Sequence, residues 1–304
     1  MPTSASEPVG IIGLGAIGGG VARAMVGAGV AVMGTDISAE ARAAFAEAGG
    51  DSIETAAQIG TKAKLVFLFL VNAGQARDVL FGAGALADAL GEGALVVSCI
   101  TMAPDDAIAL GRDLDARGIQ MLDAPTSGGA ANALKGKTKF MVSGAAEAFA
   151  RAEFAFNAVA DTVYRIGDQL GQGSTIKVVH QLLTGVHITA AMEALALGIR
   201  LGLDPQRIYD VVTGCAGNSW MFENRVPHVL SADYTPLSAV EIFVKDLGLV
   251  LDTGRQARFP LPLAAAAHQQ FLAAAAAGYG REDDAAVIKV YRDLAGLQLP
   301  AGKV

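Results

Sequence analysis

The feature that most constrains the fold is a glycine-rich turn near the amino terminus, between an apolar run and a helical pattern. Val9–Ile12 predicts a short buried strand, and apolar residues recur at helical spacing over 21–26. The turn between them reads Gly13-Leu14-Gly15-Ala16-Ile17-Gly18. Its glycines permit a tight turn and the close approach of a pyrophosphate, whose charge is stabilised by backbone N–H groups at the helix start. We therefore expect these six residues to bind a dinucleotide.

A carboxylate follows at the distance that such a site requires. The apolar segment 30–33 leads to Asp36, which lies roughly twenty residues beyond the glycines. There it would accept hydrogen bonds from the adenosine ribose hydroxyls and repel a 2′-phosphate, so the sequence predicts NAD rather than NADP, with Asp36 and Ile37 beside the adenosine. The alternative is that Asp36 caps the helix starting near Ser38.

Strand and helix patterns then alternate through the first half of the chain. The expected helices cover residues 39–48 and 73–81, and the expected strands cover residues 65–71 and 94–98. Such alternation with nearly continuous apolar strands implies a doubly wound parallel sheet, which binds ligands at the carboxyl ends of its strands. Val71 lies at the end of one expected strand and Thr101 follows the other, so both should face the cofactor, although Thr101 could instead cap a helix ahead of Asp105-Asp106.

The second half of the chain has a different character. From about Gly171 onward it is rich in alanine and leucine at helical spacing and lacks alternating strand patterns. The sequence thus predicts an α/β, Rossmann-type domain over residues 1–170, followed by an all-helical domain over residues 171–304.

Lys177 is the candidate for proton transfer. It lies early in a long apolar helical stretch, where an ammonium loses hydration, so that its pKa falls and it can donate or accept a proton. His180 and Gln181 follow at three and four positions and share its helix face. The alternative is that Lys177 reaches the surface and its polar neighbours satisfy one another.

A second glycine cluster could hold a carboxylate. Ser127, Gly128 and Gly129 combine a hydroxyl with backbone amides in a loop after the apolar segment 119–122. The alternative is an ordinary turn of proline and glycine residues.

Composition excludes several classes of function. The 304 residues are 52% hydrophobic and carry a net charge of −7, without a basic run, so neither nucleic acid nor an anionic membrane is an expected partner. Cys99 and Cys215 give no disulfide framework or zinc motif, and the histidines lack metal-ligand spacing, so we expect no metal. No signal peptide is expected, and the apolar run 65–71 is too short to span a bilayer, which favours a cytoplasmic enzyme.

Four motifs in order resemble the β-hydroxyacid dehydrogenase family, which groups 3-hydroxyisobutyrate dehydrogenase, tartronate semialdehyde reductase and 6-phosphogluconate dehydrogenase. They are residues 13–18, 123–129 and 171–177, and Lys245-Asp246-Leu247. The resemblance covers nearly the whole chain. It implies a nicotinamide-dependent dehydrogenase acting on CH–OH, with its cleft between a Rossmann part and a helical part.

The resemblance also implies roles for single residues. Lys177 corresponds to the catalytic lysine, and Ser127 with the two glycines after it corresponds to the substrate-binding loop. Thr101 corresponds to a residue beside the nicotinamide, and Lys245 to a lysine at the cofactor and substrate cleft. For Lys245 the alternative is a surface pair with Glu241, four positions earlier.

Two residues depart from the pattern of 3-hydroxyisobutyrate dehydrogenases. His180 stands where they carry asparagine, as in the phosphogluconate enzymes, and Thr126 replaces the more usual valine. Residues 214–225 and 234–238 are similar to the L-threonate dehydrogenases of this family. Polar side chains there suit a polyhydroxylated 2-hydroxy acid, because each substrate hydroxyl needs a buried partner. His180, Gln181 and Trp220 are accordingly expected to bind substrate, although Trp220 and Phe222 could be ordinary packing residues.

The expected partner is therefore a small-molecule sugar acid, with L-threonate as the leading candidate. The nearest alternatives are activity on 3-hydroxyisobutyrate or tartronate semialdehyde. Imine reductases share the architecture but generally lack the lysine and prefer NADPH, and a non-catalytic dinucleotide-binding protein would lose the lysine. Members of the family are usually dimers or tetramers, so we expect a homodimer or homotetramer.

Overall fold

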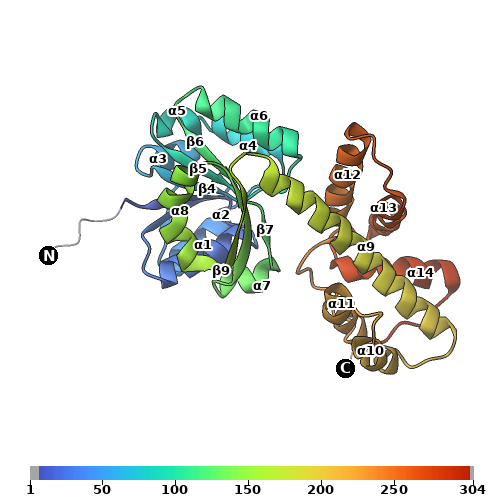
Figure 1. The fold of residues 1–304 in the computed structure, drawn as a ribbon. Coiled ribbons are helices and arrows are strands. Elements are labelled where there is room, and N and C mark those ends of the chain that lie inside the picture. The colour runs from blue at the N-terminus through green and yellow to red at the C-terminus, as the bar shows by residue number, and fades with distance from the viewer. Residues whose placement is uncertain (1–6, 302–304) are drawn as a thin grey trace. The chain divides into compact units, whose positions relative to one another are not determined.

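The computed structural model describes residues 7–301 and divides the chain into two compact units (Figure 1). The first unit runs to Lys177 and the second begins at Val178. The division falls inside helix α9 (Gln172–Arg200), slightly beyond the 170/171 boundary that the sequence predicts. One helix therefore belongs partly to each unit.

The first unit is built on a sheet whose first six strands are parallel. They follow the order β3-β2-β1-β4-β5-β6, which is the doubly wound order of dinucleotide-binding folds. Their bounds are β1 (Val9–Ile12), β2 (Val32–Thr35), β3 (Asp51–Ser52), β4 (Leu65–Leu68), β5 (Leu95–Ser98) and β6 (Gln120–Asp123). The predicted α/β class is confirmed.

Three further strands extend the sheet beyond β6. They are β7 (Thr126–Ser127), β8 (Thr138–Ser143) and β9 (Ala160–Gly167). Strand β8 is antiparallel to β6 and β7 and parallel to β9. This extension gives the loop after β7 a fixed support, because Thr126 pairs with Phe140 and Ser127 with Lys139.

Helices cover both faces of this sheet (Figure 1). On one face lie α1 (Gly18–Gly27), α2 (Ala39–Glu47), α7 (Gly129–Leu134) and α8 (Ala146–Val159); on the other lie α3 (Ala56–Gly60), α4 (Ala73–Phe81), α5 (Leu86–Leu90) and α6 (Pro104–Asp115). Successive residues of a strand point to opposite faces of the sheet, and each face has its own hydrophobic core. Phe67 of β4 packs on the first face, and Val66 and Leu68 pack on the second. Burial on both faces explains why the strands are apolar without interruption.

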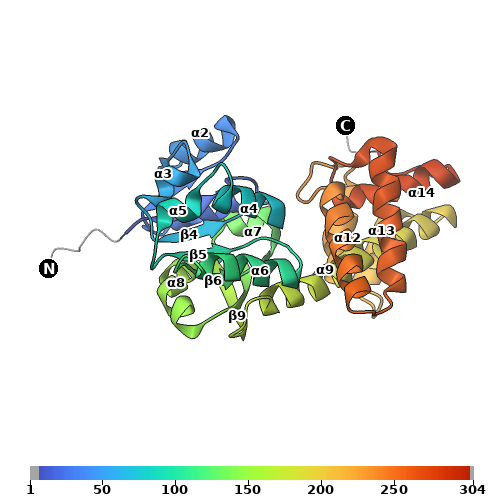
Figure 2. The same cartoon turned by 90° about the horizontal axis from the view of Figure 1, so that it is seen from above.

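The second unit is helical, as the sequence predicts. After α9 come α10 (Pro205–Thr213), α11 (Trp220–Leu230), α12 (Val240–Gln256), α13 (Pro262–Ala274), a π-helical turn (Ala275–Tyr279), a 3-10 turn (Asp284–Val287) and α14 (Ile288–Ala295). Figure 2 shows α12 beside α13, where Phe243 stacks on Phe271 with ring centroids 5.1 Å apart. The core also takes Ile188, Met192 and Leu195 from α9.

Helix α9 is 29 residues long and apolar enough to cross a membrane by length and composition. In the structure 44% of its most apolar window is buried, and Ile188, Met192 and Leu195 lie fully inside the helical core. A helix in the core of a globular unit can have the same length and apolar composition. We therefore interpret α9 as the central helix of the second unit.

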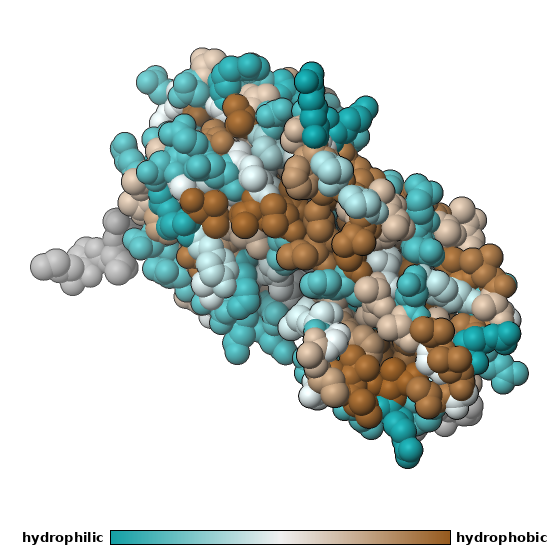
Figure 3. Space-filling view, turned by 45° about the vertical axis from the view of Figure 1, so that its right-hand side comes forward, coloured by the Kyte–Doolittle hydropathy of each residue, from teal (hydrophilic) through white to brown (hydrophobic). Residues whose placement is uncertain are grey.

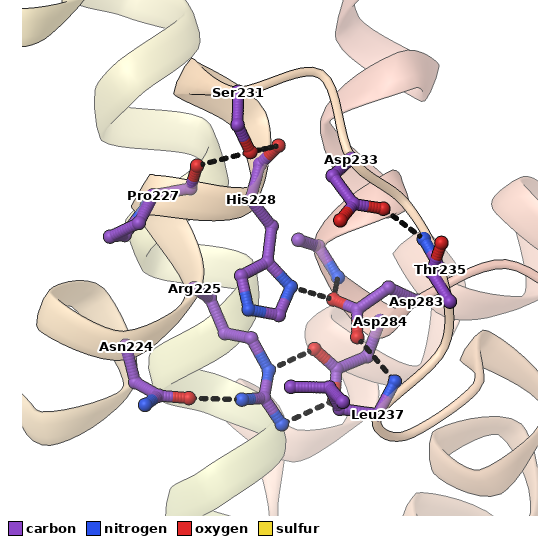
Figure 4. Close-up of polar contacts among 11 residues, drawn as sticks. Asn224, Arg225, Pro227, His228, Ser231, Asp233, Thr235, Leu237, Asp283 and Asp284 are labelled. Atoms are coloured by element: carbon purple, nitrogen blue, oxygen red, sulfur yellow. Dashed lines mark hydrogen bonds and ion pairs between the residues drawn. The ribbon is translucent and has the colours of Figure 1, made fainter.

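Two polar contacts join α11 to the 3-10 turn of this unit and to its N-cap residue, Asp283 (Figure 4). Arg225 donates from Nε to Oδ1 of Asp284 at 2.5 Å and from Nη2 to Oδ2 at 3.1 Å. His228 Nδ1 lies 2.9 Å from Oδ1 of Asp283, whose Oδ2 accepts from the backbone N–H of Leu237. These contacts tie the loop between α11 and α12 to the start of the last helical segment.

Candidate active site

The surroundings of each glycine in the amino-terminal turn show what a side chain at that position would meet. A Cβ on Gly13, where φ is +94°, would lie 2.2 Å from the carbonyl oxygen of Phe69, and one on Gly18 would lie 2.0 Å from that of Gly13. A Cβ on Gly15 would meet nothing within 4 Å, so this residue faces open space at the start of α1. The outer glycines thus permit the turn and the helix packing, and the middle one leaves the backbone accessible to a pyrophosphate.

Asp36 lies at the carboxyl end of β2 and braces the glycine turn. Its Oδ2 accepts from the backbone N–H of Leu14 at 2.7 Å, and its Oδ1 accepts from that of Ser38 at 2.8 Å. Ser38 itself caps α2 through the N–H of Ala41, so the alternative that Asp36 is the N-cap is wrong. Ile37 is fully exposed beside it. This arrangement of turn and carboxylate fits an adenine dinucleotide.

Two other loops end at the same edge of the sheet. Val71 follows β4 and is about half exposed, and its N–H donates to Oε1 of Gln75. Thr101 follows β5 and is partly exposed between two buried neighbours, Ile100 and Met102. Helix α6 takes Ala103 as its N-cap, so the alternative role of Thr101 as a cap is wrong. The parallel register aligns the ends of β1, β4 and β5, which brings these loops beside the glycine turn.

The loop after β7 is a tight turn whose backbone requires glycine at two positions. Gly128 and Gly129 have φ values of +121° and +72°, which favour glycine, and they start α7 directly after Ser127. A Cβ on Gly129 would meet nothing within 4 Å, and the residue is exposed. The loop therefore presents one hydroxyl and accessible backbone close together, as a carboxylate requires.

Lys177 is buried, with only 6% of its surface exposed, although it lies one turn into α9. The alternative that it reaches the surface is therefore wrong for this structure. Burying a charged amine is unfavourable unless neighbouring groups compensate its charge, and buried ionisable groups are common at functional sites. Lys177 is therefore a functional candidate.

The buried carboxylate of Asp123 fixes the start of α9. Asp123 accepts the backbone N–H groups of Gly171 and Ser174 on Oδ2, at 3.1 and 2.7 Å, and the Ser174 hydroxyl on Oδ1 at 2.8 Å. Burial raises the pKa of Asp123, and these hydrogen bonds oppose the rise. A Cβ on Gly173 would lie 2.6 Å from the Asp123 carbonyl oxygen, so the helix packs closely here. Asp123 thereby sets the position of Lys177, a role that sequence reasoning missed.

The helical unit contributes a chain of polar side chains, of which Gln181 and Asp246 are buried and His180 and Lys245 are partly buried. Gln181 Nε2 donates to Asp246 Oδ2 at 2.5 Å, and Gln181 Oε1 lies 2.9 Å from His180 Nδ1. Lys245 Nζ lies 2.6 Å from Oδ1 of Asp246. Lys245 thus pairs with its sequence neighbour, and not with Glu241 as the alternative required. Asp246 is a further residue that sequence reasoning placed within a motif without giving it a role.

Trp220 and Phe222 have different surroundings. Phe222 is buried and stacks on Tyr209 with centroids 6.3 Å apart, so for Phe222 the packing interpretation is correct. Trp220, the first residue of α11, is 61% exposed and is not a core residue of the described structure. Arg225, from the same stretch, is bound to Asp284 within the core. Over residues 7–301 no group of three metal-ligating side chains is found.

A dinucleotide-binding unit followed by a helical unit, with a buried lysine on the helix they share, defines a nicotinamide-dependent oxidoreductase. The family models agree: residues 8–167 match the NAD-binding domain of 6-phosphogluconate dehydrogenase, and residues 171–291 match the NAD-binding model of NADP-dependent 3-hydroxyisobutyrate dehydrogenase. The chain belongs to the β-hydroxyacid dehydrogenase family, in its 3-hydroxyisobutyrate dehydrogenase-like group.

Individual relatives cover the whole chain. The L-threonate dehydrogenase of Cupriavidus necator is 54% identical over 97% of this chain and 98% of its own length. That of Escherichia coli K12 is 48% identical over the full length of both. Among solved structures, one from Salmonella typhimurium described as 3-hydroxyisobutyrate dehydrogenase is 48% identical, with a TM-score of 0.87 over 93% of this chain and 99% of that one. Imine reductases at about 20% identity share the fold alone.

If Ser127 binds the substrate carboxylate, replacing it with alanine is expected to raise KM for the acid about tenfold and to change kcat less, because one hydrogen bond to the carboxylate would be lost. Steady-state kinetics at saturating dinucleotide measures both constants. A matched control is Ser231→Ala, since Ser231 is an exposed serine at the end of α11 in the other unit. An unchanged KM in the Ser127 variant would remove this residue from the substrate site.

Proposed function

We propose that this enzyme oxidises L-threonate at its 2-hydroxyl, giving the 2-oxo acid, with NAD as the oxidant. The observation that carries the proposal is the 45–54% identity to five L-threonate dehydrogenases, each aligned over at least 96% of this chain. The polar chain around His180 supports it, because a polyhydroxylated acid needs buried hydrogen-bonding partners for its hydroxyls.

In the proposed mechanism, the hydroxyl of Ser127 and the amides of the following glycines hold the substrate carboxylate. Lys177 contacts the 2-hydroxyl and accepts its proton, or relays it, as the carbon is oxidised; in reverse it returns the proton. His180 hydrogen-bonds to the substrate and orients it. Bound NAD supplies the chemistry of hydride acceptance. The turn from Gly13 to Gly18, together with Asp36, Ile37, Val71, Thr101 and Lys245, would hold the dinucleotide.

NAD is preferred to NADP in this proposal because of Asp36. Its carboxylate lies at the end of β2 and is tied to the glycine turn, so a 2′-phosphate placed there would face a fixed negative charge. Asp36→Asn keeps an oxygen for the Leu14 N–H and removes the charge. We expect it to shift the NAD/NADP ratio of kcat/KM about tenfold toward NADP. Wild-type enzyme that works much better with NADP than with NAD would contradict this assignment.

The function itself is tested by following NADH absorbance over a panel of acids with both dinucleotides. The panel contains L-threonate, D-threonate, 3-hydroxyisobutyrate and, in the reducing direction, tartronate semialdehyde and a cyclic imine. We expect the highest kcat/KM with L-threonate. A higher value with 3-hydroxyisobutyrate, the substrate named for the Salmonella structure, would replace the proposal with the runner-up. Turnover of the imine alone would move the enzyme to another reaction class.

We further propose a cytoplasmic homodimer or homotetramer. Cys99 and Cys215 are both unpaired, and Cys215 is exposed, which suits a reducing compartment. Apolar side chains reach the surface, as the brown areas of Figure 3 show. The exposed apolar residues of the helical unit include Leu197, Leu201 and Leu263. Where exposed apolar side chains form a large contiguous patch, the patch is typical of a protein–protein contact. Light scattering after size exclusion measures the subunit number.

A further inference from the structure

In the chain of polar side chains of the helical unit, each hydrogen-bond donor and acceptor can be assigned from the atoms involved. At one end is Asp246, which is 2% exposed and carries the Lys245 ammonium 2.6 Å from its Oδ1. The aspartate pairs with this ammonium as a carboxylate, and a carboxylate only accepts hydrogen bonds. Whatever faces its other oxygen must therefore be a donor.

Gln181 is that donor, which fixes how its amide is turned. Its Nε2 lies 2.5 Å from Asp246 Oδ2, so the amide oxygen, Oε1, points to the opposite side. A flipped amide would place two acceptor oxygens together inside the protein, which is unfavourable. Gln181 is itself 6% exposed, so water cannot readily compensate for such a flip.

The next hydrogen bond in the chain joins Gln181 to His180. Gln181 Oε1 lies 2.9 Å from Nδ1 of the imidazole. Thr184 Oγ1, on the next turn of α9, lies 3.4 Å from the same nitrogen, and its hydroxyl hydrogen is donated to the His180 carbonyl at 2.8 Å. Nδ1 thus faces two acceptors, so it must carry the proton.

We propose that Asp246 and Gln181 are positioning residues that hold the neutral form of His180 as its Nδ1–H tautomer, in which Nε2 is the acceptor nitrogen of the ring and accepts a hydrogen bond from a hydroxyl of the sugar acid when substrate binds. The inference rests on the proposed function for the identity of the substrate, and on the hydrogen bonds alone for the tautomer. It gives Gln181 a different role from direct substrate contact. It also explains what the histidine that replaces asparagine would do, because an acceptor nitrogen held in place selects an acid with a further hydroxyl group.

The tautomer is read directly from the ring nitrogen shifts of protein labelled with 15N-histidine, at a pH where the imidazoles are neutral. Single His→Gln variants assign the signals. We expect the proton of His180 on Nδ1. His268 is an internal reference of opposite sense, because its Nε2 lies 2.9 Å from the Val244 carbonyl oxygen and must be the donor. A wild-type spectrum with the His180 proton on Nε2 overturns the inference, whatever the enzyme oxidises.

The relay from Asp246 through Gln181 to His180 is then cut at its middle. Gln181→Met keeps the length and removes both polar ends, and we expect His180 to become a mixture of tautomers. Asp246→Leu should act in the same way, whereas Asp246→Asn retains an acceptor for Gln181 and should restore most of the Nδ1–H form. Gln256→Met, the same change at an exposed position of α12, is the matched control and should leave the spectrum unaltered. An unchanged His180 tautomer in Gln181→Met contradicts the relay.

Kinetics connect the relay to the substrate. Gln181→Met is expected to raise KM for L-threonate about tenfold with a smaller change in kcat, since one directed hydrogen bond is lost. The same variant should show no such rise with 2-hydroxybutyrate, which lacks the additional hydroxyls. An equal rise for both acids would overturn the link to the substrate hydroxyl. Absence of L-threonate oxidation in the wild type, with the tautomer as predicted, would instead defeat the proposed function and leave the relay standing.

Discussion

Lys177→Ala is expected to lower kcat for L-threonate oxidation at least about a hundredfold while leaving NADH binding intact. The reason is that the 2-hydroxyl must lose its proton as the hydride leaves, and the buried amine is the group proposed to accept it. Without that amine, the proton must pass to water or to a weaker base. Stopped-flow or steady-state measurement of NADH formation gives kcat, and fluorescence titration of NADH gives the binding constant.

A second substitution separates proton transfer from positive charge. Lys177→Arg keeps a cation at this position, but a guanidinium stays protonated in proteins and cannot accept the proton of the substrate hydroxyl. We expect kcat of Lys177→Arg to stay close to that of Lys177→Ala. Recovery of most of the turnover in the arginine variant would mean that charge alone is used. Lys62→Ala removes an exposed lysine of the first unit and serves as the control. Unaltered turnover in Lys177→Ala would refute the catalytic role altogether.

The parts of the fold that the sequence predicts well are those determined by local pattern. The strand 9–12 and the helix 73–81 are found at the expected bounds, because apolar runs and helical spacing report directly on burial. Strands β7 and β9 gave no such signal. The first has two residues, and the second is half exposed along most of its length, so neither shows the apolar run of a buried strand.

In the candidate site, too, the features that depend on local spacing were predictable and those that depend on long-range contacts were not. Asp36 was predictable because its distance from the glycines is a property of one βαβ unit. The support given by Asp123 to α9 joins residues 51 positions apart, and that given by Asp246 to Gln181 joins residues 65 apart. Hydrogen bonds over such separations depend on the packed fold. Residue spacing therefore identified Lys177 and His180 as candidates, and only the structure identifies what holds them.

Arg225 illustrates how a polar residue near a functional motif can instead serve stability. It comes from a stretch with polar side chains suited to a hydroxylated acid, yet its guanidinium forms two hydrogen bonds with the buried carboxylate of Asp284 (Figure 4). Burial raises the pKa of Asp284 to about 6, and the arginine charge and hydrogen bonds oppose a further rise. At neutral pH the pair is therefore charged on both sides and closed.

Arg225→Met is expected to lower the free energy of unfolding by about 3–5 kcal/mol, because it leaves the Asp284 carboxyl buried without its cation. Urea denaturation at fixed protein concentration measures this loss. Arg255→Met is the matched control: its pair with Asp252 is 2.8 Å long but largely exposed, so its removal should cost less than about 1 kcal/mol. A loss equally small in both variants would show that the Arg225 pair does not hold the unit together.

The double variant and the pH dependence test the cause of that loss. Adding Asp284→Leu to Arg225→Met removes the uncompensated carboxyl, so the double variant should be more stable than Arg225→Met alone. Without Arg225, the folded-state pKa of Asp284 rises further above its unfolded value near 3.9. The folded variant then holds a proton that the unfolded chain releases, so its stability falls as pH rises through that folded pKa. The loss caused by Arg225→Met should accordingly be smaller at pH about 5 than at pH about 8. A loss independent of pH, or a double variant no more stable than the single one, would mean that packing of the arginine side chain, and not its charge, joins α11 to the 3-10 turn.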